Sequence, residues 1–152
     1  MTVVAVSDTG PLIHLAEIES LDLLSVCDQL YIPETAYEEL QQGSVPDAFA
    51  DLSYELVEAS TQPDTDQLDP GERAAIAVAN SRDAILLTDD LAAREAATEA
   101  GIEVHGSVGI IALAYARERI DKSDASSRMR SLQRESTLFI TDAVVERGIE
   151  LL

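Results

Sequence analysis

Short runs of apolar, often β-branched residues alternate along this chain with longer stretches in which apolar residues recur at helical spacing. The first pattern is typical of buried strands and the second of amphipathic helices. A chain that alternates between them favours an α/β fold built around a mostly parallel sheet. We therefore predict a three-layer α/β/α fold, in which helices cover both faces of a sheet of about five strands.

The predicted strands are short apolar runs bounded by Gly, Pro, Asp or Ser. The run that begins at Tyr54 is predicted to lie at an edge of the sheet. The polar stretches Gly43 to Ala48 and Ser60 to Gln67 are expected to form a loop and a connection. The strands are expected at Val3 to Val6, Leu30 to Ile32, Tyr54 to Glu58, Ala84 to Thr88 and Ile102 to His105.

Helices are expected where apolar residues recur at helical spacing behind a capping residue or a proline. Pro11 suits a first helical turn, and Gly101 is expected to end a helix. The last two predicted helices form a helical tail from about residue 120. The helices are expected at about Pro11 to Ile18, Leu21 to Val26, Pro33 to Leu40, Asp69 to Arg82, Asp90 to Ala100, Ser107 to Arg119, Ser123 to Arg134 and Thr141 to Leu151.

The length of 152 residues suits one domain spanning residues 1–152. Cys27 has no partner for a disulfide, and no Cys and His cluster has zinc-site spacing, so we expect a reducing environment. The longest apolar run, Gly109 to Ala116, is too short to cross a bilayer, and the N-terminus lacks the positive charge of a secretion signal. We expect a soluble, cytoplasmic protein without membrane contact.

The formal net charge of −19, from 29 acidic and 10 basic residues, is extreme for this length, and Lys122 is the only lysine. Such a surface indicates a halophilic protein, because the Debye length falls to ~3 Å in 1 M salt and self-repulsion is then screened. Most carboxylates are therefore expected on a solvated face. An acidic residue can be assigned to a site only on its position in the fold.

Two groups of acids follow directly on predicted strands. Asp8 ends the first strand, and Asp89 and Asp90 end the strand that begins at Ala84. In open parallel sheets the site lies beyond the carboxyl ends of the strands, so these acids should approach each other if the two strands are neighbours. Three small hydroxyl residues flank the acids and are candidates for bonding a carboxylate or a bound water: Ser7, Thr9 and Thr88.

Two helical acids can join this edge. Glu39 lies near the end of its predicted helix, and Glu72 lies in the first turn of another. Glu38 and Glu39 differ in direction by about 100°, so at most one of them points inward. Carboxylates that converge raise each other's pKa unless a cation is present, and Mg²⁺ or Mn²⁺ is the ion that carboxylates and water suit best.

Each acid also has a purely structural alternative. Asp8 can serve only as the cap of the helix that follows it, and one of Asp89 and Asp90 is expected to be an N-cap. Asp69 and Glu72 stand three residues apart, as in a capping box. The sequence therefore leaves open which of these acids serve a site.

Several other classes of site are disfavoured. His14 and His105 lack paired ligand spacing, so a packed or surface histidine is expected at each. The chain has neither a GxxxxGK loop nor a GxGxxG fingerprint, which excludes the usual nucleotide sites. A phospho-receiver domain needs a lysine on its last strand, and Ile102 to His105 has none. A haloacid-dehalogenase-like phosphatase needs a second aspartate where Gly10 stands.

Four segments resemble the motifs of PIN-domain proteins, in the same order and spacing: SDTGPLIHLA, IPETAYEEL, DPGERAAIAVA and LLTDDLAAR. The resemblance includes VapC-like toxins and is closest to a PIN-like subgroup of mostly unassigned role. It continues through GIEVHGSVGIIALA to the tail LFITDAVVERGIELL and so covers essentially the whole chain. The fold that it implies, a parallel sheet with helices on both sides, agrees with the hydrophobic pattern.

The resemblance also assigns acids one by one. The family's aspartate at the end of the first strand matches Asp8, and its glutamate before a leucine in an early helix matches Glu39. The third acid is usually aspartate in the family and is Glu72 here, which is a departure. The fourth acid follows the next strand in a Thr-x-Asp pattern and matches Asp90, with Asp89 as an additional acid.

These residues imply a divalent-metal-dependent endoribonuclease that hydrolyses RNA phosphodiester bonds. Asp8 and Asp90, with Asp89 beside them, are the expected metal ligands, while Glu39 and Glu72 would complete the shell or orient the water. The alternative is a non-catalytic PIN-like scaffold, which the departure at Glu72 keeps open.

The expected partners are an RNA substrate, a small antitoxin protein and a second copy of the chain, since many relatives are toxins that are restrained by an antitoxin and assemble as dimers. Between Arg117 and Arg134 basic residues outnumber acidic ones, so this segment is expected to contact phosphates or an acidic partner. Pairing of these arginines with the acidic surface is the alternative. The expected contact residues are Arg117, Arg119, Arg128 and Arg130.

Overall fold

The computed structural model describes residues 2–59 and 68–152. The predicted connection Ser60 to Gln67 lies outside these residues. The strands are β1 (Val4–Ser7), β2 (Gln29–Pro33), β3 (Glu55–Val57), β4 (Ile85–Leu87) and β5 (Val104–His105). The helices are α1 (Thr9–Glu17), η1 (Leu21–Val26), α2 (Glu34–Gln42), η2 (Asp47–Asp51), α3 (Pro70–Arg82), α4 (Leu91–Glu99), α5 (Ser107–Ala116), α6 (Lys122–Glu135) and α7 (Asp142–Glu150).

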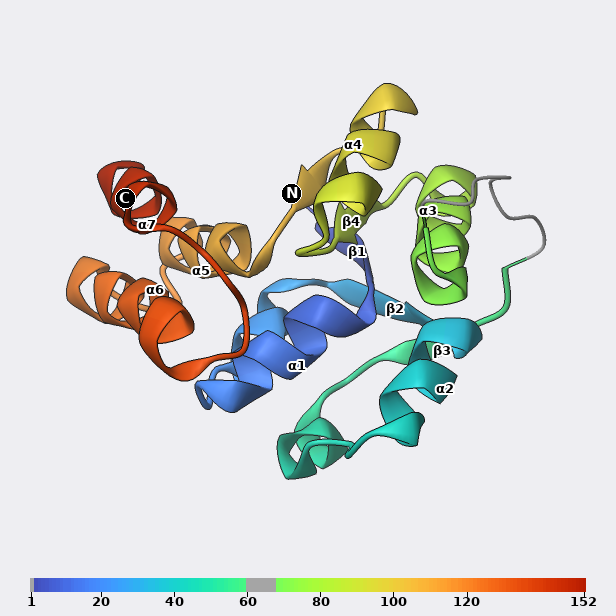
Figure 1. The fold of residues 1–152 in the computed structure, drawn as a ribbon, viewed down its shortest axis with the longest axis horizontal. Helices are drawn as coiled ribbons and strands as arrows, with labels where there is room; N and C mark the ends of the chain where they lie inside the picture. The colour runs from blue at the N-terminus through green and yellow to red at the C-terminus, as the bar shows by residue number, and fades with distance from the viewer. Residues whose placement is uncertain (1, 60–67) are drawn as a thin grey trace.

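The five strands form one parallel sheet in the order β3-β2-β1-β4-β5, with helices on both sides (Figure 1). β1 lies in the middle, where Val6 pairs with Tyr31 of β2 and Ser7 pairs with Leu87 of β4. β1 and β4 are therefore neighbours, which was the condition for their acids to meet, and both run in the same direction. This register brings the residues that follow β1 and β4 to the same edge of the sheet.

The core has two halves, one on each face of the sheet. Ala5 belongs to the half formed with α1, α5 and α6, while the next residue, Val6, belongs to the half formed with α3 and α4. Successive side chains on a strand point to opposite faces, so a strand buried on both sides needs apolar residues at every position. This explains why the sequence of β1 shows a continuous apolar run.

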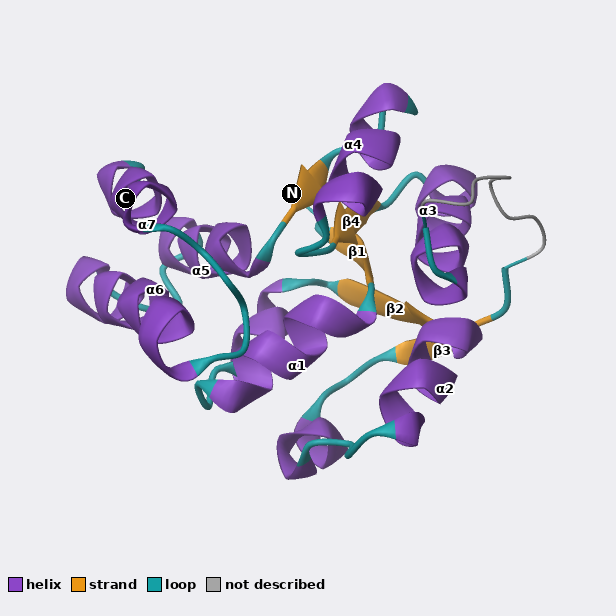
Figure 2. Cartoon of the chain, in the orientation of Figure 1, coloured by secondary structure: helices purple, strands orange, loops and turns teal. Residues whose placement is uncertain are grey.

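The helical tail packs against the first of these halves. Met129 and Leu132 of α6 are fully buried, and Val145 of α7 is 2 % exposed. Gly148 brings α7 close to its neighbours, because a Cβ there would lie 2.7 Å from Val108 Cγ1 and 3.0 Å from Met129 Sδ. Figure 2 shows α5, α6 and α7 side by side as a group of helices at one end of the molecule.

Most predicted elements are present, with some corrections. The segment Leu21–Val26 is a 3₁₀ helix, in which hydrogen bonds run from an N–H to the carbonyl three residues before it, as from Cys27 to Leu24. Part of the predicted loop Gly43 to Ala48 enters η2, whose Phe49 is buried against the Tyr54 ring. The helix expected to reach Arg119 ends at Ala116, because the chain turns left-handed at residue 118.

Candidate functional site

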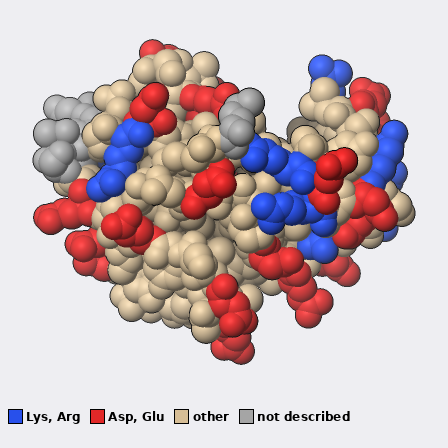
Figure 3. All heavy atoms as spheres, turned by 180° about the vertical axis from the view of Figure 1, so that it is seen from behind, with Lys and Arg blue, Asp and Glu red and all other residues tan. Residues whose placement is uncertain are grey.

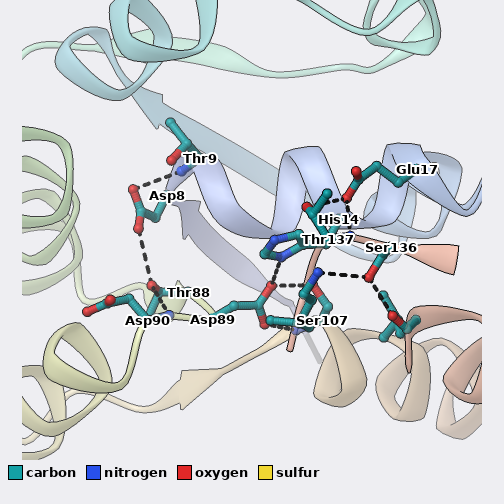
Figure 4. A network of polar contacts seen from close by, with 12 residues as sticks. Asp8, Thr9, His14, Glu17, Thr88, Asp89, Asp90, Ser107, Ser136 and Thr137 are labelled. Atoms are coloured by element: carbon teal, nitrogen blue, oxygen red, sulfur yellow. Dashed lines mark hydrogen bonds and ion pairs between the residues drawn. The ribbon is translucent and has the colours of Figure 1, made fainter. Parts of the chain in front are cut away.

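Asp8 lies at the centre of the carboxyl edge of the sheet. Its side chain caps α1 by accepting a hydrogen bond of 2.8 Å from the backbone N–H of Thr9, and its Oδ2 accepts one of 3.2 Å from the Thr88 hydroxyl (Figure 4). The backbone N–H of Asp8 donates to the carbonyl of Leu87. Asp8 is therefore both the predicted cap and the residue that joins the ends of β1 and β4.

The carboxyl group of Asp8 is costly to ionise in this position. Asp8 is only 4 % exposed, and burial raises its pKa to about 7. The hydrogen bonds from Thr9 and Thr88 lower the pKa, whereas the nearby charges of Asp69 and Glu39 raise it further. A carboxylate that is desolvated and faces other carboxylates is an unfavourable charge, which a neighbouring cation would offset.

Glu39 is held against the start of α3. Its Oε1 accepts a hydrogen bond of 2.9 Å from the backbone N–H of Gly71, and burial raises its pKa. Gly71 permits this contact, since a Cβ there would lie 2.5 Å from Glu39 Oε2. The neighbouring Glu38 is exposed, whereas Glu39 is half-buried against the start of α3.

Glu72 lies in the first turn of α3 and faces several acids. Its backbone N–H donates to Oδ1 of the N-cap Asp69 at 2.8 Å, as in the first half of a capping box. Its Oε2 is buried without a hydrogen-bond partner. Burial is the largest of the causes that raise the pKa of Glu72 to about 9. The others are a side-chain hydrogen bond that protonated Glu72 donates to Asp69 and the charges of Asp69, Asp90 and Asp8.

Asp69 is a member of this acidic group that the sequence analysis treated only as a helix cap. Its charge raises the pKa of Asp8, Glu39 and Glu72, which places it close to all three carboxyl groups. The sequence carried one signal of this role. Asp69 opens the same helix as Glu72, so both residues had to lie at the same end of α3.

Asp90 and Asp89 point in different directions. Asp90 is the N-cap of α4 and accepts a hydrogen bond of 2.9 Å from the Ala93 N–H, as predicted for one of the pair. Asp89 turns toward α1 and α5, where it accepts bonds of 2.6 Å from both the N–H and the hydroxyl of Ser107 and one of 2.7 Å from His14 Nδ1 (Figure 4).

The electrostatics of Asp89 differ from those of the other acids. Burial alone would raise the pKa of Asp89, but the hydrogen bonds from His14 and Ser107 outweigh burial and lower it. Its negative charge is thus already stabilised by protein groups, without a cation. Both of its oxygens are engaged in these contacts.

The small hydroxyl residues behave differently from one another. Thr88 donates to Asp8 Oδ2, and its oxygen also accepts a bond of 3.2 Å from the Asp90 N–H, so it links the two acids directly. The Ser7 hydroxyl donates to the backbone carbonyl of Asp8 at 2.9 Å. Thr9 contacts Asp8 through its backbone N–H. Of the three, Thr88 is the one whose hydroxyl touches two site acids.

The basic residues of the tail lie away from the acids at the carboxyl edge of the sheet. On the face in Figure 3, Lys and Arg side chains gather over the part built by α5 to α7, while acids are scattered. Cys27 lies just before β2, and burial raises the pKa of its thiol to about 11, while the charge of the nearby Arg117 lowers it. Cys27 and Arg117 therefore lie at the amino end of the sheet, opposite Asp8. Arg128 bonds to Asp124 and Ser20.

The donors at the carboxyl edge suit a hard divalent cation. They are carboxylate oxygens, and Glu72 Oε2 is a buried acceptor without a partner. Within residues 2–59 and 68–152, however, no three His, Cys, Asp or Glu side chains already stand close enough together to hold one ion. The donor chemistry therefore fits a metal, and binding one would require side chains to draw together.

The architecture and this edge define an α/β protein of parallel-sheet type with an acidic site at the carboxyl ends of its central strands. A protein-family model described as PIN domain matches residues 4–152, so the chain belongs to the PIN domain family. Proteins of this family are generally nucleases. None of the curated proteins matches this chain.

A solved structure supports the fold. It is a PilT N-terminus domain protein from the hyperthermophilic archaeon Sulfolobus solfataricus P2, similar with a TM-score of 0.59 and 21 % sequence identity over 71 % of this chain and 90 % of that one. At this identity the likeness concerns the fold alone. Among the described residues, no helix has the length and apolar character needed to cross a membrane.

Proposed function

We propose that this protein is a divalent-metal-dependent endoribonuclease that hydrolyses phosphodiester bonds in RNA. The observation that carries the proposal is the environment of Asp8, a buried carboxyl group with a pKa of about 7 at the middle of the carboxyl edge. The charges of Asp69 and Glu39 act on it, and Thr88 ties it to the turn that carries Asp90. Such a group favours a bound cation.

Asp8 and Asp90 would hold Mg²⁺ or Mn²⁺, because they follow adjacent parallel strands and the Thr88 hydroxyl joins the Asp8 carboxylate to the Asp90 backbone N–H. A bound cation supplies stabilisation of charge on the scissile phosphate and lowers the pKa of water. Asp89 was an expected ligand, but its side chain turns away from Asp90 toward α1 and α5, where Ser107 and His14 hold it. The proposal therefore does not rely on it.

Glu72 and Glu39 would complete the ligand shell or orient the attacking water. Glu72 Oε2 is buried without a hydrogen-bond partner, so it would accept a hydrogen bond from the attacking water. Its pKa of about 9 means that it holds a proton at neutral pH until a cation offsets the neighbouring charges. Glu39 is fixed by Gly71 and so offers a pre-set position for the remaining ligand or water.

Exposed arginines of the tail, which lie away from the site acids, would contact RNA at phosphates distant from the scissile one. Arg119 and Arg130 are exposed and lie in the basic segment, so they are the proposed phosphate contacts. Arg128 is half-buried and bonded to Asp124, which fits the alternative that some arginines of the segment serve the fold. An acidic partner protein would use the same exposed pair.

The test is cleavage of a mixed RNA pool at high salt with Mg²⁺, Mn²⁺ or a chelator. Asp8→Asn and Asp90→Asn should each abolish metal-dependent cutting, because each removes a ligand charge. Asp51→Asn is the matched control, since Asp51 is an exposed acid of η2 and should behave as the wild type. Cutting that survives in folded Asp8→Asn, or the absence of cutting by folded wild type with every metal, would refute the proposal.

A non-catalytic scaffold is the second candidate function. The observation in its favour is that no three potential ligands within the described residues are already gathered for one ion. Two apolar side chains, Phe139 at 91 % and Leu91 at 74 %, are also exposed and available for contact with a partner protein. A small antitoxin or a second copy of the chain would cover them. Stable complex formation without metal-dependent cutting is the outcome that favours this reading.

A further inference from the structure

We infer that Asp89 is a positioning residue, and that its contacts with His14 and Ser107 hold the Thr88–Asp90 turn in place for the site. We call these three residues the Asp89 clamp. The part of the inference that concerns metal affinity rests on the proposed function. The part that concerns the rigidity of the turn does not.

The clamp sits inside the turn that serves the site. Thr88 and Asp90 flank Asp89, and the Thr88 hydroxyl contacts both Asp8 Oδ2 and the Asp90 N–H. The Asp89 side chain leaves the turn on the other side (Figure 4). Fixing Asp89 therefore fixes the backbone of Thr88 and Asp90 on either side of it, and this uses the side chain of neither Asp8 nor Asp90.

Three elements meet at the Asp89 carboxylate. Ser107 is the first residue of α5, so its N–H is one of the unpaired donors at a helix start, and Asp89 Oδ1 accepts from it at 2.6 Å. His14 belongs to α1, the helix that begins immediately after Asp8. A carboxylate can only accept, so His14 Nδ1 donates to Asp89 Oδ2 at 2.7 Å.

The Asp89 clamp therefore links the two site acids, Asp8 and Asp90, through α1 and His14. α1 carries the backbone that follows Asp8, and the turn carries Asp90, so the bond from His14 to Asp89 helps to set the spacing between the two acids. The direct bridge through Thr88 is longer, at 3.2 Å on each side. The clamp bonds are short and charge-assisted, and these are the stronger kind.

The surroundings keep water from replacing these bonds. Ser107 is fully buried and the Asp89 side chain is 7 % exposed. Gly106 allows the close approach, because a Cβ there would lie 2.7 Å from both Asp89 Oδ1 and an Arg94 terminal nitrogen. Loss of one clamp partner would leave another buried polar group without a hydrogen bond, which loosens the turn.

The chain offers a matched control for the clamp. Glu17, also on α1, accepts bonds from the N–H and the hydroxyl of Thr137 at 3.0 and 2.8 Å, both on Oε1 and both exposed, whereas Asp89 accepts the two Ser107 groups on separate oxygens. This contact ties α1 to the segment between α6 and α7, away from the acids. Thr137→Val removes a hydroxyl-to-carboxylate bond on α1 just as Ser107→Ala does, but outside the clamp.

The experiment compares wild type with Ser107→Ala, His14→Leu, His14→Asn and Thr137→Val. Amide hydrogen exchange is measured on the metal-free proteins at the N–H groups of Asp90 and Ala93, and Mn²⁺ affinity is measured separately by electron paramagnetic resonance. Ser107→Ala and His14→Leu should exchange faster at both amides and bind Mn²⁺ about 10-fold more weakly, a typical effect of losing a group that supports a metal ligand.

The controls decide between positioning and general destabilisation. His14→Asn keeps an N–H donor near the place of Nδ1 and should restore both values, while Thr137→Val should match the wild type. Unchanged exchange at Asp90 and Ala93 in Ser107→Ala and His14→Leu would overturn the clamp. Failure of the wild type to bind Mn²⁺ would instead overturn the proposed function, and the exchange data would still decide whether the clamp exists.

Discussion

The carboxylate of Glu39 rests on the backbone N–H of Gly71, at 2.9 Å and across 32 positions of sequence. The contact joins the end of α2 to the first turn of α3. The start of a helix has unpaired N–H groups and a positive dipole end, so it is a favourable place for a carboxylate. It also brings Glu39 next to Asp69 and Glu72, which open the same helix.

Replacement of Gly71 by alanine tests this contact. A Cβ at residue 71 would lie 2.5 Å from Glu39 Oε2 and 2.9 Å from Glu39 Cδ, so the flexible side chain must move away. The lost hydrogen bond costs about 1 kcal/mol, and alanine regains about the same through helix propensity. Gly71→Ala should therefore unfold with nearly unchanged stability in urea but bind Mn²⁺ more weakly.

Gly43→Ala is the control for that measurement. Its Cβ would meet only the Leu40 carbonyl, at 3.8 Å, which is an ordinary van der Waals contact. It should bind Mn²⁺ like the wild type. Equal metal affinity for Gly71→Ala and Gly43→Ala would show that Glu39 plays no part in the site.

The stability of the metal-free protein should fall as pH rises. Burial raises the pKa of Asp8 from 3.8 to about 7 and that of Glu72 from 4.5 to about 9. Above about pH 4 the unfolded chain has released these protons, whereas the folded state still holds them. The contribution of the two groups to stability is therefore complete only at low pH. It is lost as the pH rises through 7 and then 9.

Thermal unfolding in a chelator from pH 5 to 9 measures this dependence. Asp8→Asn should flatten the fall between pH 5 and 7, because its uncharged side chain does not titrate, while Asp51→Asn should keep the wild-type slope. Excess Mg²⁺ should offset the fall, since the cation binds the ionised carboxylates. A wild-type slope in Asp8→Asn would contradict the assigned environment of Asp8.

Two arginines of α6 should differ in what they do. Arg128 bonds to Asp124 at 2.9 Å and to the buried Ser20 at 2.9 Å, so Arg128→Ser should lower the free energy of unfolding by roughly 1 kcal/mol with little effect on RNA affinity. Arg130 is exposed on the same helix. Arg130→Ser should leave stability unchanged and weaken RNA binding.

To distinguish Arg128→Ser from Arg130→Ser, each is made in an inactive Asp8→Asn background, and RNA affinity is measured at several salt concentrations. Loss of one phosphate contact lowers the dependence of log K on log salt by about 1. The assignment fails if Arg130→Ser leaves this slope unchanged, or if Arg128→Ser reduces it as strongly as Arg130→Ser.

Salt should stabilise the folded protein. A net charge of −19 on 152 residues produces self-repulsion, which is screened as the Debye length falls from ~10 Å at 0.1 M to ~3 Å at 1 M. We expect the unfolding temperature to rise by more than about 3 °C over this range of KCl, the shift that ~1 kcal/mol gives a domain of this size. Sucrose at equal osmolality controls for general solute effects. An equal rise in sucrose would remove screening as the cause.

The sequence alone predicted most of the elements that build this fold. A continuous apolar run in β1 and helical spacing after Asp69 are local patterns, and they follow from which faces of an element are buried. The sequence also predicted that Asp8 and Asp90 would meet at one edge, on the condition that their strands are neighbours. The pairing of Ser7 with Leu87 meets that condition.

The tertiary structure decided where individual side chains point. Asp89 stands between two site residues in sequence, yet its partners His14 and Ser107 are 75 and 18 positions away, and they turn it toward α1 and α5. Asp69 looked like a helix cap and is also a charge facing Asp8. A pattern along the chain encodes period and order, whereas the direction of a side chain in a turn is set by distant groups that only folding brings to it.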